Sequence, residues 1–264
     1  DLIIGAVGND RGGSDAGAAC VVFGKAAGFG TDVDGRHVFD LAGLKANRGF
    51  IIQGDSASDS AGWSVSSASD VNGDGFDDII VGATDNDDGG DKAGDAYVIF
   101  GTASGFGANV AGQHVLDLSK LSASQGFIVK GDTTGDEAGF SVSSAGDVNG
   151  DGFDPDAVLS PSRALTPVVA RVNERIVKAS GFGSKVGGQR VIDLTTLTAH
   201  QGFAIQGYAA GDQTGWSVSS AGDLNGDGFD DILVGAPLNS TDNSGKDLPW
   251  CGRAYIIYGT ASGF

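Results

Sequence analysis

The sequence lacks methionine and has only two cysteines, five prolines and three histidines. The two cysteines, Cys20 and Cys251, lie near opposite ends of the chain, which excludes a disulfide framework of the kind that holds small secreted domains together. We expect Cys20 to be a buried residue of the strand "ACVVFG" and Cys251 to be a loop thiol, although they are also the one pair able to form a disulfide. The missing methionine indicates a fragment or a processed piece of a longer protein.

Long apolar runs and an excess of basic charge are missing as well. No stretch approaches the roughly 20 apolar residues of a membrane-spanning helix, and the first ten residues have no basic region typical of a signal peptide. The formal net charge of −18 opposes binding to a nucleic-acid backbone or to an anionic membrane surface. The sequence therefore predicts no nucleic-acid partner and no membrane insertion, and it favours cations as the natural counterpart.

Glycine and aspartate are abundant instead. Glycine occurs 46 times, and all acidic residues except Glu137 and Glu174 are aspartate. Both residue types favour turns, whereas glutamate is typical of helix surfaces, so we expect the acidic residues in loops between short strands.

The sequence repeats with a period near 77 residues. "GWSVSSASDVNGDGFDDIIVGA" from Gly62 returns as "GFSVSSAGDVNGDGFD" from Gly139 and as "GWSVSSAGDLNGDGFDDILVGAP" from Gly215, at spacings of 77 and 76 residues. Each unit offers four strand-like stretches rich in Val, Ile and aromatic residues, as in "WSVSSA", "DIIVGA", "AYVIFG" and "FIIQG". Four strands per repeat predict an all-β fold, a β-propeller of four-stranded antiparallel blades. No segment has the 3.6-residue periodicity of a helical repeat.

Blade boundaries follow from the order of these strands. The chain begins and ends inside repeats, so we expect a single propeller segment over 1–264 with about four blades, two of them incomplete. The predicted units are a partial blade at 1–54, blades at 62–131 and 139–207, and a partial blade at 215–264. One short helical turn is expected in "FDLAGL", "LDLSKL" and "IDLTTL", capped by Asp40, Asp117 and Asp193.

One segment, 155–177, breaks the pattern. "PDAVLSPSRALTPVVARVNERIV" replaces the acidic, glycine-rich loop and the strand found in the other units, while the length is nearly preserved. We interpret this as a local reading-frame error or as misassigned residues rather than a functional insertion. An unshifted frame in the resequenced coding DNA would contradict this interpretation.

The stretch "DVNGDGFDD" places oxygen donors at alternate positions of a loop. Positions 1, 3, 5, 7 and 9 are Asp70, Asn72, Asp74, the Phe76 carbonyl and Asp78. Oxygen ligands without His or Cys select calcium or magnesium, and the open site favours Ca²⁺. An EF-hand would need Glu at position 12, where this chain has Val81, so the loop joins two strands. A simple hairpin turn is the alternative for a single such loop.

Recurrence strengthens the calcium prediction. The second complete donor set is Asp223, Asn225, Asp227, Phe229 and Asp231. A third set has Asp147, Asn149, Asp151 and Phe153, but its ninth position is Pro155, for which Asp154 or Asp156 could substitute. Asp1 aligns with Asp78 and would be the last ligand of a further loop.

These residues resemble the FG-GAP repeats of the integrin α-subunit β-propeller, and more closely the bacterial integrin-like proteins built from such repeats. The repeat glycine of the "FG" is kept at Gly62, Gly139 and Gly215, although Ala or Thr precedes it, and "GAP" is complete at 235–237. The resemblance implies a seven-bladed propeller with calcium loops between strands 1 and 2 on one face. It implies partner recognition on the opposite face, by the segments 54–62, 84–95, 131–139, 207–215 and 237–252. Tyr208 and Trp250 are candidate contact residues there, unless their rings pack between blades.

The expected function is a non-catalytic binding module for an extracellular protein or glycan, secreted or on a bacterial cell surface, in which calcium stabilises loops. The alternative is an accessory propeller of a secreted enzyme such as a hydrolase or lyase. A catalytic propeller is less favoured, because His37, His114 and His200 fall in no nucleophile or zinc motif.

Overall fold

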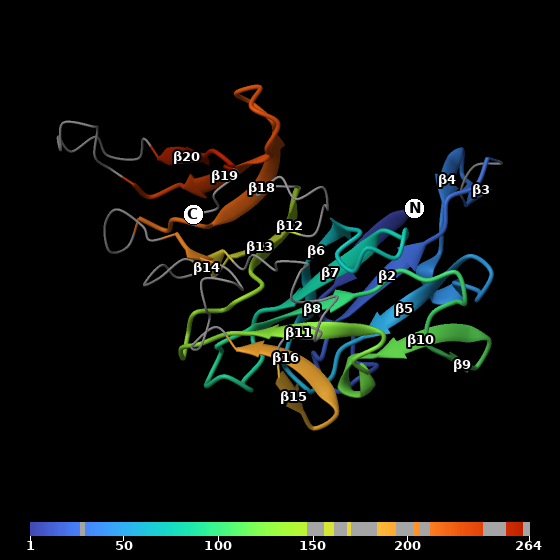
Figure 1. The fold of residues 1–264 in the computed structure, drawn as a ribbon. Coiled ribbons are helices and arrows are strands. Elements are labelled where there is room, and N and C mark those ends of the chain that lie inside the picture. Colours follow the sequence, from blue (N-terminus) through green and yellow to red (C-terminus); the bar gives the residue numbers. More distant parts are fainter. Residues whose placement is uncertain are drawn as a thin grey trace.

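The computed structural model describes residues 1–26, 30–146, 156–160, 168–169, 184–193, 203–205, 212–239 and 252–260. These residues form strands and loops, and the helical elements among them are two short 3-10 turns (Figure 1). The prediction of an all-β chain is confirmed, and the arrangement of the sheets is consistent with a β-propeller.

The most complete sheet holds one unit of the repeat. Strands β6 (Ala61–Ser69), β7 (Asp78–Ala83), β8 (Asp95–Ile99) and β11 (Gly126–Lys130) pair antiparallel in this order. They coincide with the four stretches that the sequence marks as strands. The Gly- and Asp-rich segments between them are loops, as their turn-forming residues require.

The neighbouring units form related sheets. On the N-terminal side, β1 (Leu2–Ala6), β2 (Ala18–Val22) and β5 (Gly49–Gln53) pair antiparallel. On the C-terminal side the strands are β12 (Ser141–Gly146) paired with β13 (Asp156–Ser160), β14 (Val168–Val169) paired with β17 (Phe203–Ala204), and the meander β18 (Ser217–Gly222), β19 (Asp231–Ala236) and β20 (Arg253–Ile257). Figure 1 shows β18 to β20 beside β12, next to the sheet that contains β6 and β7.

The connection between the third and fourth strands of a unit contains a hairpin that pairs with the sheet of the preceding unit. Strands β9 (Ala108–Val110) and β10 (Gln113–Asp117) form this hairpin, and β10 pairs parallel with β5 of the preceding unit. The next hairpin, β15 (Ser184–Val186) and β16 (Gln189–Asp193), pairs in the same way with β11. The earliest one consists of β3 (Thr31–Val33) and β4 (Arg36–Val38). The β9–β10 and β15–β16 hairpins thus extend the sheets of the units that precede them with hydrogen-bonded strands.

The predicted helical turns are confirmed at two of three positions. A 3-10 turn covers Leu41–Gly43, where the Asp40 carboxylate accepts a hydrogen bond from the backbone N–H of Ala42. A second covers Leu118–Lys120 with Asp117 in the same capping role. The turn expected after Asp193 lies outside the described residues.

Glycines of the "FG" and "GAP" motifs meet at the junction between units. A Cβ added to Gly82 would overlap the carbonyl oxygen of Gly139, and one added to Gly5 would overlap that of Gly62. Both partners, Gly62 and Gly139, have positive φ angles of 83° and 85°. The two motifs thus allow the backbones of adjacent sheets to approach closely, which only residues without side chains permit.

The core lies between adjacent sheets. Phe50 and Ile52 of β5, Tyr97 of β8 and Leu116 of β10 are buried in one cluster, so side chains of two units fill a common space. Cys20 in β2 is buried, as predicted, whereas Cys251 lies outside the described residues.

Candidate functional site

The first candidate metal loop is closed by hydrogen bonds to its own carboxylates. The Asp70 side chain accepts hydrogen bonds from the backbone N–H groups of Asp74 (3.0 Å) and Gly75 (2.8 Å). Asn72 accepts from the N–H of Asp74 (2.8 Å) and donates to the Asp74 carboxylate (2.9 Å), which also accepts from the N–H of Phe76 (3.0 Å). The side chains of positions 1, 3 and 5 therefore gather on the inner side of a curled backbone.

Asp78 connects this loop to the sheet. Its two carboxylate oxygens accept hydrogen bonds from the N–H groups of Val71 (2.9 Å) and Gly101 (2.7 Å). Burial raises the pKa of Asp78 to about 7, these two hydrogen bonds oppose the rise, and repulsion by Asp74 and Asp70 adds to it. A cation close to these three carboxylates would relieve the repulsion.

The second candidate loop repeats this arrangement. Asp223 accepts from the N–H groups of Asp227 (3.0 Å) and Gly228 (2.9 Å), and these hydrogen bonds, with that of Gly228 foremost, lower its pKa. Asp231 accepts from the N–H groups of Leu224 (2.9 Å) and Gly259 (3.0 Å), as Asp78 does in the first loop. The remaining equivalent bonds join Asn225, Asp227 and Phe229. Two loops 153 residues apart, from Asp70 to Asp223, thus have the same geometry.

The third candidate loop, with Asp147, Asn149, Asp151 and Phe153, lies outside the described residues. The strands that flank it are described, and they pair Gly146 with Asp156. The equivalent pairs are Ser69 with Asp78 and Gly222 with Asp231. The third loop is one residue longer, so Asp156 rather than Pro155 holds the register position of the ninth ligand.

The donor chemistry of both described loops fits a hard divalent cation, because every predicted ligand is a carboxylate, amide or carbonyl oxygen. No three Asp, Glu, His or Cys side chains in the described ranges are gathered closely enough to hold a metal ion. The carboxylates of positions 1 and 9 are instead occupied by backbone N–H groups. Both described loops are curled and acidic.

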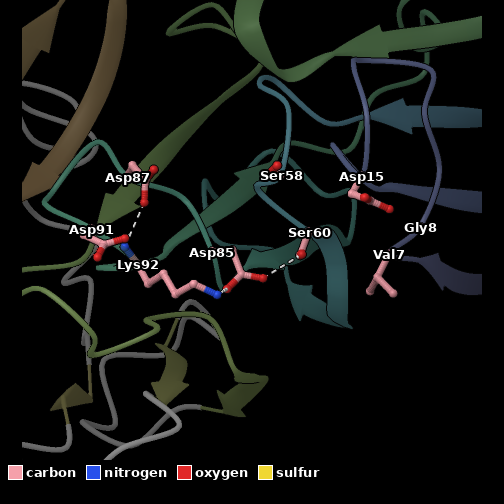
Figure 2. A pocket seen from close by; sticks show the side chains of 9 residues that line it. All are labelled: Val7, Gly8, Asp15, Ser58, Ser60, Asp85, Asp87, Asp91 and Lys92. Atoms are coloured by element: carbon pink, nitrogen blue, oxygen red, sulfur yellow. Dashed lines mark hydrogen bonds and ion pairs between the residues drawn. The ribbon is translucent and has the colours of Figure 1, made fainter.

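A polar hollow of about 370 Å³ lies where loops of the first two units meet (Figure 2). Its lining comes from 54–62, 84–95 and the loop after β1, so two of the five predicted recognition segments lie side by side here. Lys92 forms an ion pair of 2.6 Å with Asp85, which also accepts a hydrogen bond of 2.7 Å from Ser60. Asp15, Asp87 and Asp91 also line the hollow, which therefore has more acidic than basic groups.

A row of aromatic side chains, which the sequence analysis did not identify, runs across three units. The Phe140 ring lies 5.5 Å from that of Trp63 and 5.0 Å from that of Trp216, measured between ring centroids. Trp63 and Trp216 are 47% and 43% exposed. Each of the three residues directly follows the repeat glycine of its unit. This shared position in the repeat is the sequence feature from which the row could have been predicted. Tyr208 and Trp250, the predicted contact residues, lie outside the described residues.

Two of the three histidines lie within the described residues. His37 is exposed in β4 and His114 is partly buried in β10, while His200 lies outside the described residues. Each described histidine lies on a hairpin between the third and fourth strands of its unit.

Comparisons with known proteins agree with the repeat analysis. The model of the FG-GAP repeat matches residues 61–99 and 214–246. Integrin alpha-PS5 of Drosophila melanogaster is 26% identical over 222 residues, which cover 84% of this chain and 18% of that protein. The chain thus spans less than a fifth of the length of this relative. These findings support the resemblance to FG-GAP and integrin α-like proteins. Within the described residues, no helix is long and apolar enough to span a membrane.

Proposed function

We propose that the chain is part of a calcium-stabilised β-propeller that binds a protein or glycan outside the cell and catalyses no reaction. The observation that carries the proposal is the hydrogen-bond pattern shared by the loops from Asp70 to Asp78 and from Asp223 to Asp231. The FG-GAP match and the similarity to an integrin α chain support an extracellular binding role.

Calcium has a structural role in this proposal. Residues Asp70, Asn72, Asp74, Asp78 and the Phe76 carbonyl would hold one ion, and their counterparts in the second loop would hold another. The bound ion supplies positive charge where Asp78 is buried near two other carboxylates. Binding of the ion only to the folded loop raises the stability of the fold by linkage.

Recognition takes place on exposed surfaces that several units share. The aromatic row of Trp63, Phe140 and Trp216 offers large, rigid contact area of the kind enriched at interfaces. The polar hollow beside Asp85 offers carboxylates and hydroxyl groups that suit basic or hydroxyl-rich ligand groups. Both features lie on loops and strand ends, so ligand binding there requires no rearrangement of the cores between the sheets.

Calorimetric titration with CaCl₂ and thermal melting in calcium and in chelator test the proposal. We expect saturable binding, a higher melting temperature in calcium, and the loss of one bound ion in Asp74→Asn, which keeps the side-chain acceptor of the turn. The matched control is Asp32→Asn, which removes one charge from an exposed turn where Asp32 accepts from the N–H of Gly35. No saturable binding up to several millimolar calcium, a ceiling typical of extracellular modules, would contradict the proposal.

A further inference from the structure

Two aspartates lie together at the junction between the first two units, away from the candidate metal loops. Asp55 and Asp59 belong to the connection between β5 and β6, and their carboxyl groups lie within hydrogen-bonding reach of each other. Asp59 is only 5% exposed. Two ionised carboxylates have no hydrogen to share, so a hydrogen bond between them requires a proton.

The neighbouring donors leave one oxygen of the pair without a partner. Asn86 donates a hydrogen bond of 2.9 Å to Asp59, and the Tyr97 hydroxyl donates one of 2.7 Å to Oδ2 of Asp55. Oδ1 of Asp55 is buried and has no donor in the described structure. A proton on Asp59 would supply that donor and would remove one of the two negative charges.

The charged groups around the pair are acidic. Repulsion by Asp88, from the loop after β7, raises the pKa of Asp59. The negative charges of Asp55 and of Asp95 in β8 likewise raise the pKa of the Tyr97 hydroxyl. Asp95 is itself buried, with one oxygen unpartnered, and Lys130 is the basic group that acts on it. The nearby Lys92 is paired with Asp85. This surrounding charge favours protonation of the pair over ionisation.

The same pair occurs in the next unit. Asp136 is 5% exposed, has a buried Oδ2 without a donor, and its carboxyl group lies within hydrogen-bonding reach of Asp132. In the third unit Tyr208 replaces the first aspartate. There the remaining acid, Asp212, accepts hydrogen bonds from the N–H (3.0 Å) and the hydroxyl (2.9 Å) of Thr214.

We infer that the pairs Asp55–Asp59 and Asp132–Asp136 each share one proton at neutral pH, and that loss of this proton in alkaline solution weakens the junctions between units. The inference stands apart from calcium binding, since neither pair belongs to a candidate metal loop. It assigns a dependence of stability on pH to these two connections, whereas the sequence of the third unit has Tyr208 in place of the first aspartate.

The direction of the pH effect follows from linkage. Burial, hydrogen bonding to the paired acid and repulsion raise the pKa of Asp59 to about 8 and that of Asp136 to about 7. In the unfolded chain an aspartate has a pKa of about 3.9. Between these values the folded chain binds more protons than the unfolded chain, so the free energy of unfolding falls as pH rises and levels off above the folded pKa.

Urea unfolding of the full chain from pH 5 to 9, in chelator throughout, measures this effect. We expect each pair to lower the folding equilibrium constant by up to about tenfold per pH unit within its window. In Asp59→Asn/Asp136→Asn, each amide can donate to the paired acid, so the dependence on pH should become shallower and stability at pH 8 should rise. Asp91→Asn is the control, because Asp91 is an exposed aspartate of the connection between β7 and β8 and belongs to neither pair. An unchanged slope in the double variant, with the wild-type slope intact, would overturn the inference.

Carbon-13 NMR titration of the aspartate carboxyl groups in the wild-type chain gives a direct readout that needs no stability comparison. The resonance missing from Asp59→Asn identifies Asp59, and we expect it to titrate above pH 6 in the wild-type chain. A midpoint near pH 4 would show that the pair holds no proton at neutral pH. If the variant does not fold, selective labelling and the distinct high midpoint identify the resonance instead, and the absence of any high midpoint counts equally against the inference.

Discussion

The hydroxyl group of Tyr97 in β8 donates a hydrogen bond of 2.7 Å to Asp55, which follows β5 of the preceding unit. This bond joins two units through buried polar groups, and Asn86 donates to the same hydroxyl at 3.3 Å. Tyr97→Phe would remove the donor to Asp55 and the acceptor for Asn86 while keeping the ring in place. We expect a loss of about 1–3 kcal/mol in the free energy of unfolding, the cost of leaving buried polar groups unsatisfied.

Urea denaturation checks this prediction, with Tyr258→Phe as the matched control. Tyr258 is 51% exposed, so loss of its hydroxyl should change stability by no more than about 0.5 kcal/mol. Equal effects of both substitutions would mean that the bond between the units contributes nothing specific.

Gly82→Ala tests the contact between the "FG" and "GAP" glycines. The added Cβ would overlap the Gly139 carbonyl and lie 2.6 Å from the Ser64 Oγ, so adjacent sheets would have to separate. We expect a loss of about 2 kcal/mol or more, or failure to fold, as for severe overpacking. At the control position, Gly43, an added Cβ meets its nearest atom at 3.8 Å, and Gly43→Ala should be close to neutral. Thermal melting distinguishes the two, and a neutral Gly82→Ala would refute the close approach.

Leu116→Ala tests whether the β9–β10 hairpin contributes to stability. Leu116 is buried in the cluster of Phe50 and Ile52 from the preceding unit, so its truncation leaves a cavity between two units. We expect a loss of about 2–5 kcal/mol, typical of buried Leu→Ala changes. Val110→Ala in β9 removes a side chain that is 47% exposed and should have little effect. If the urea midpoints of the two variants agree, the hairpin does not contribute to the stability of the fold.

Cys20 should resist thiol reagents in the folded chain. Burial raises the pKa of its thiol, while Arg11 opposes the rise, so thiolate is scarce and access is limited. In a Cys251→Ser background, we expect labelling by a chromogenic disulfide reagent to be slow in buffer and fast in urea. Labelling in buffer at the rate of a free thiol would contradict the burial of β2.

The sequence predicts the parts of the fold that depend on local pattern. "DIIVGA" and "AYVIFG" are short β-branched and aromatic runs between turn residues, and they form β7 and β8 as expected. Asp40 and Asp117 cap turns because an aspartate side chain readily accepts from a following N–H. The order of oxygen donors in the candidate metal loops is likewise local, since it depends on alternation within nine residues.

Features that depend on contacts between units were not predictable in the same way. Strand β9 is three exposed residues long and has no alternation, and only its partner β10, aligned with β5, makes the hairpin part of a sheet. The ring contacts of Trp63, Phe140 and Trp216 join residues 76 or 77 positions apart. The role of Asp156 depends on strand register, which the extra residue of its loop shifts by one.

The parallel pairing of β10 with β5 has a consequence for shortened forms of the chain. Because the following unit supplies the strand that covers the outer edge of each sheet, a cut made before that hairpin would expose unpaired N–H and C=O groups along β5 or β11. Such bare edges are templates for intermolecular strand pairing and aggregation. Soluble truncations should therefore end after a complete β9–β10 or β15–β16 hairpin, because its second strand pairs with the edge strand β5 or β11 of the preceding unit.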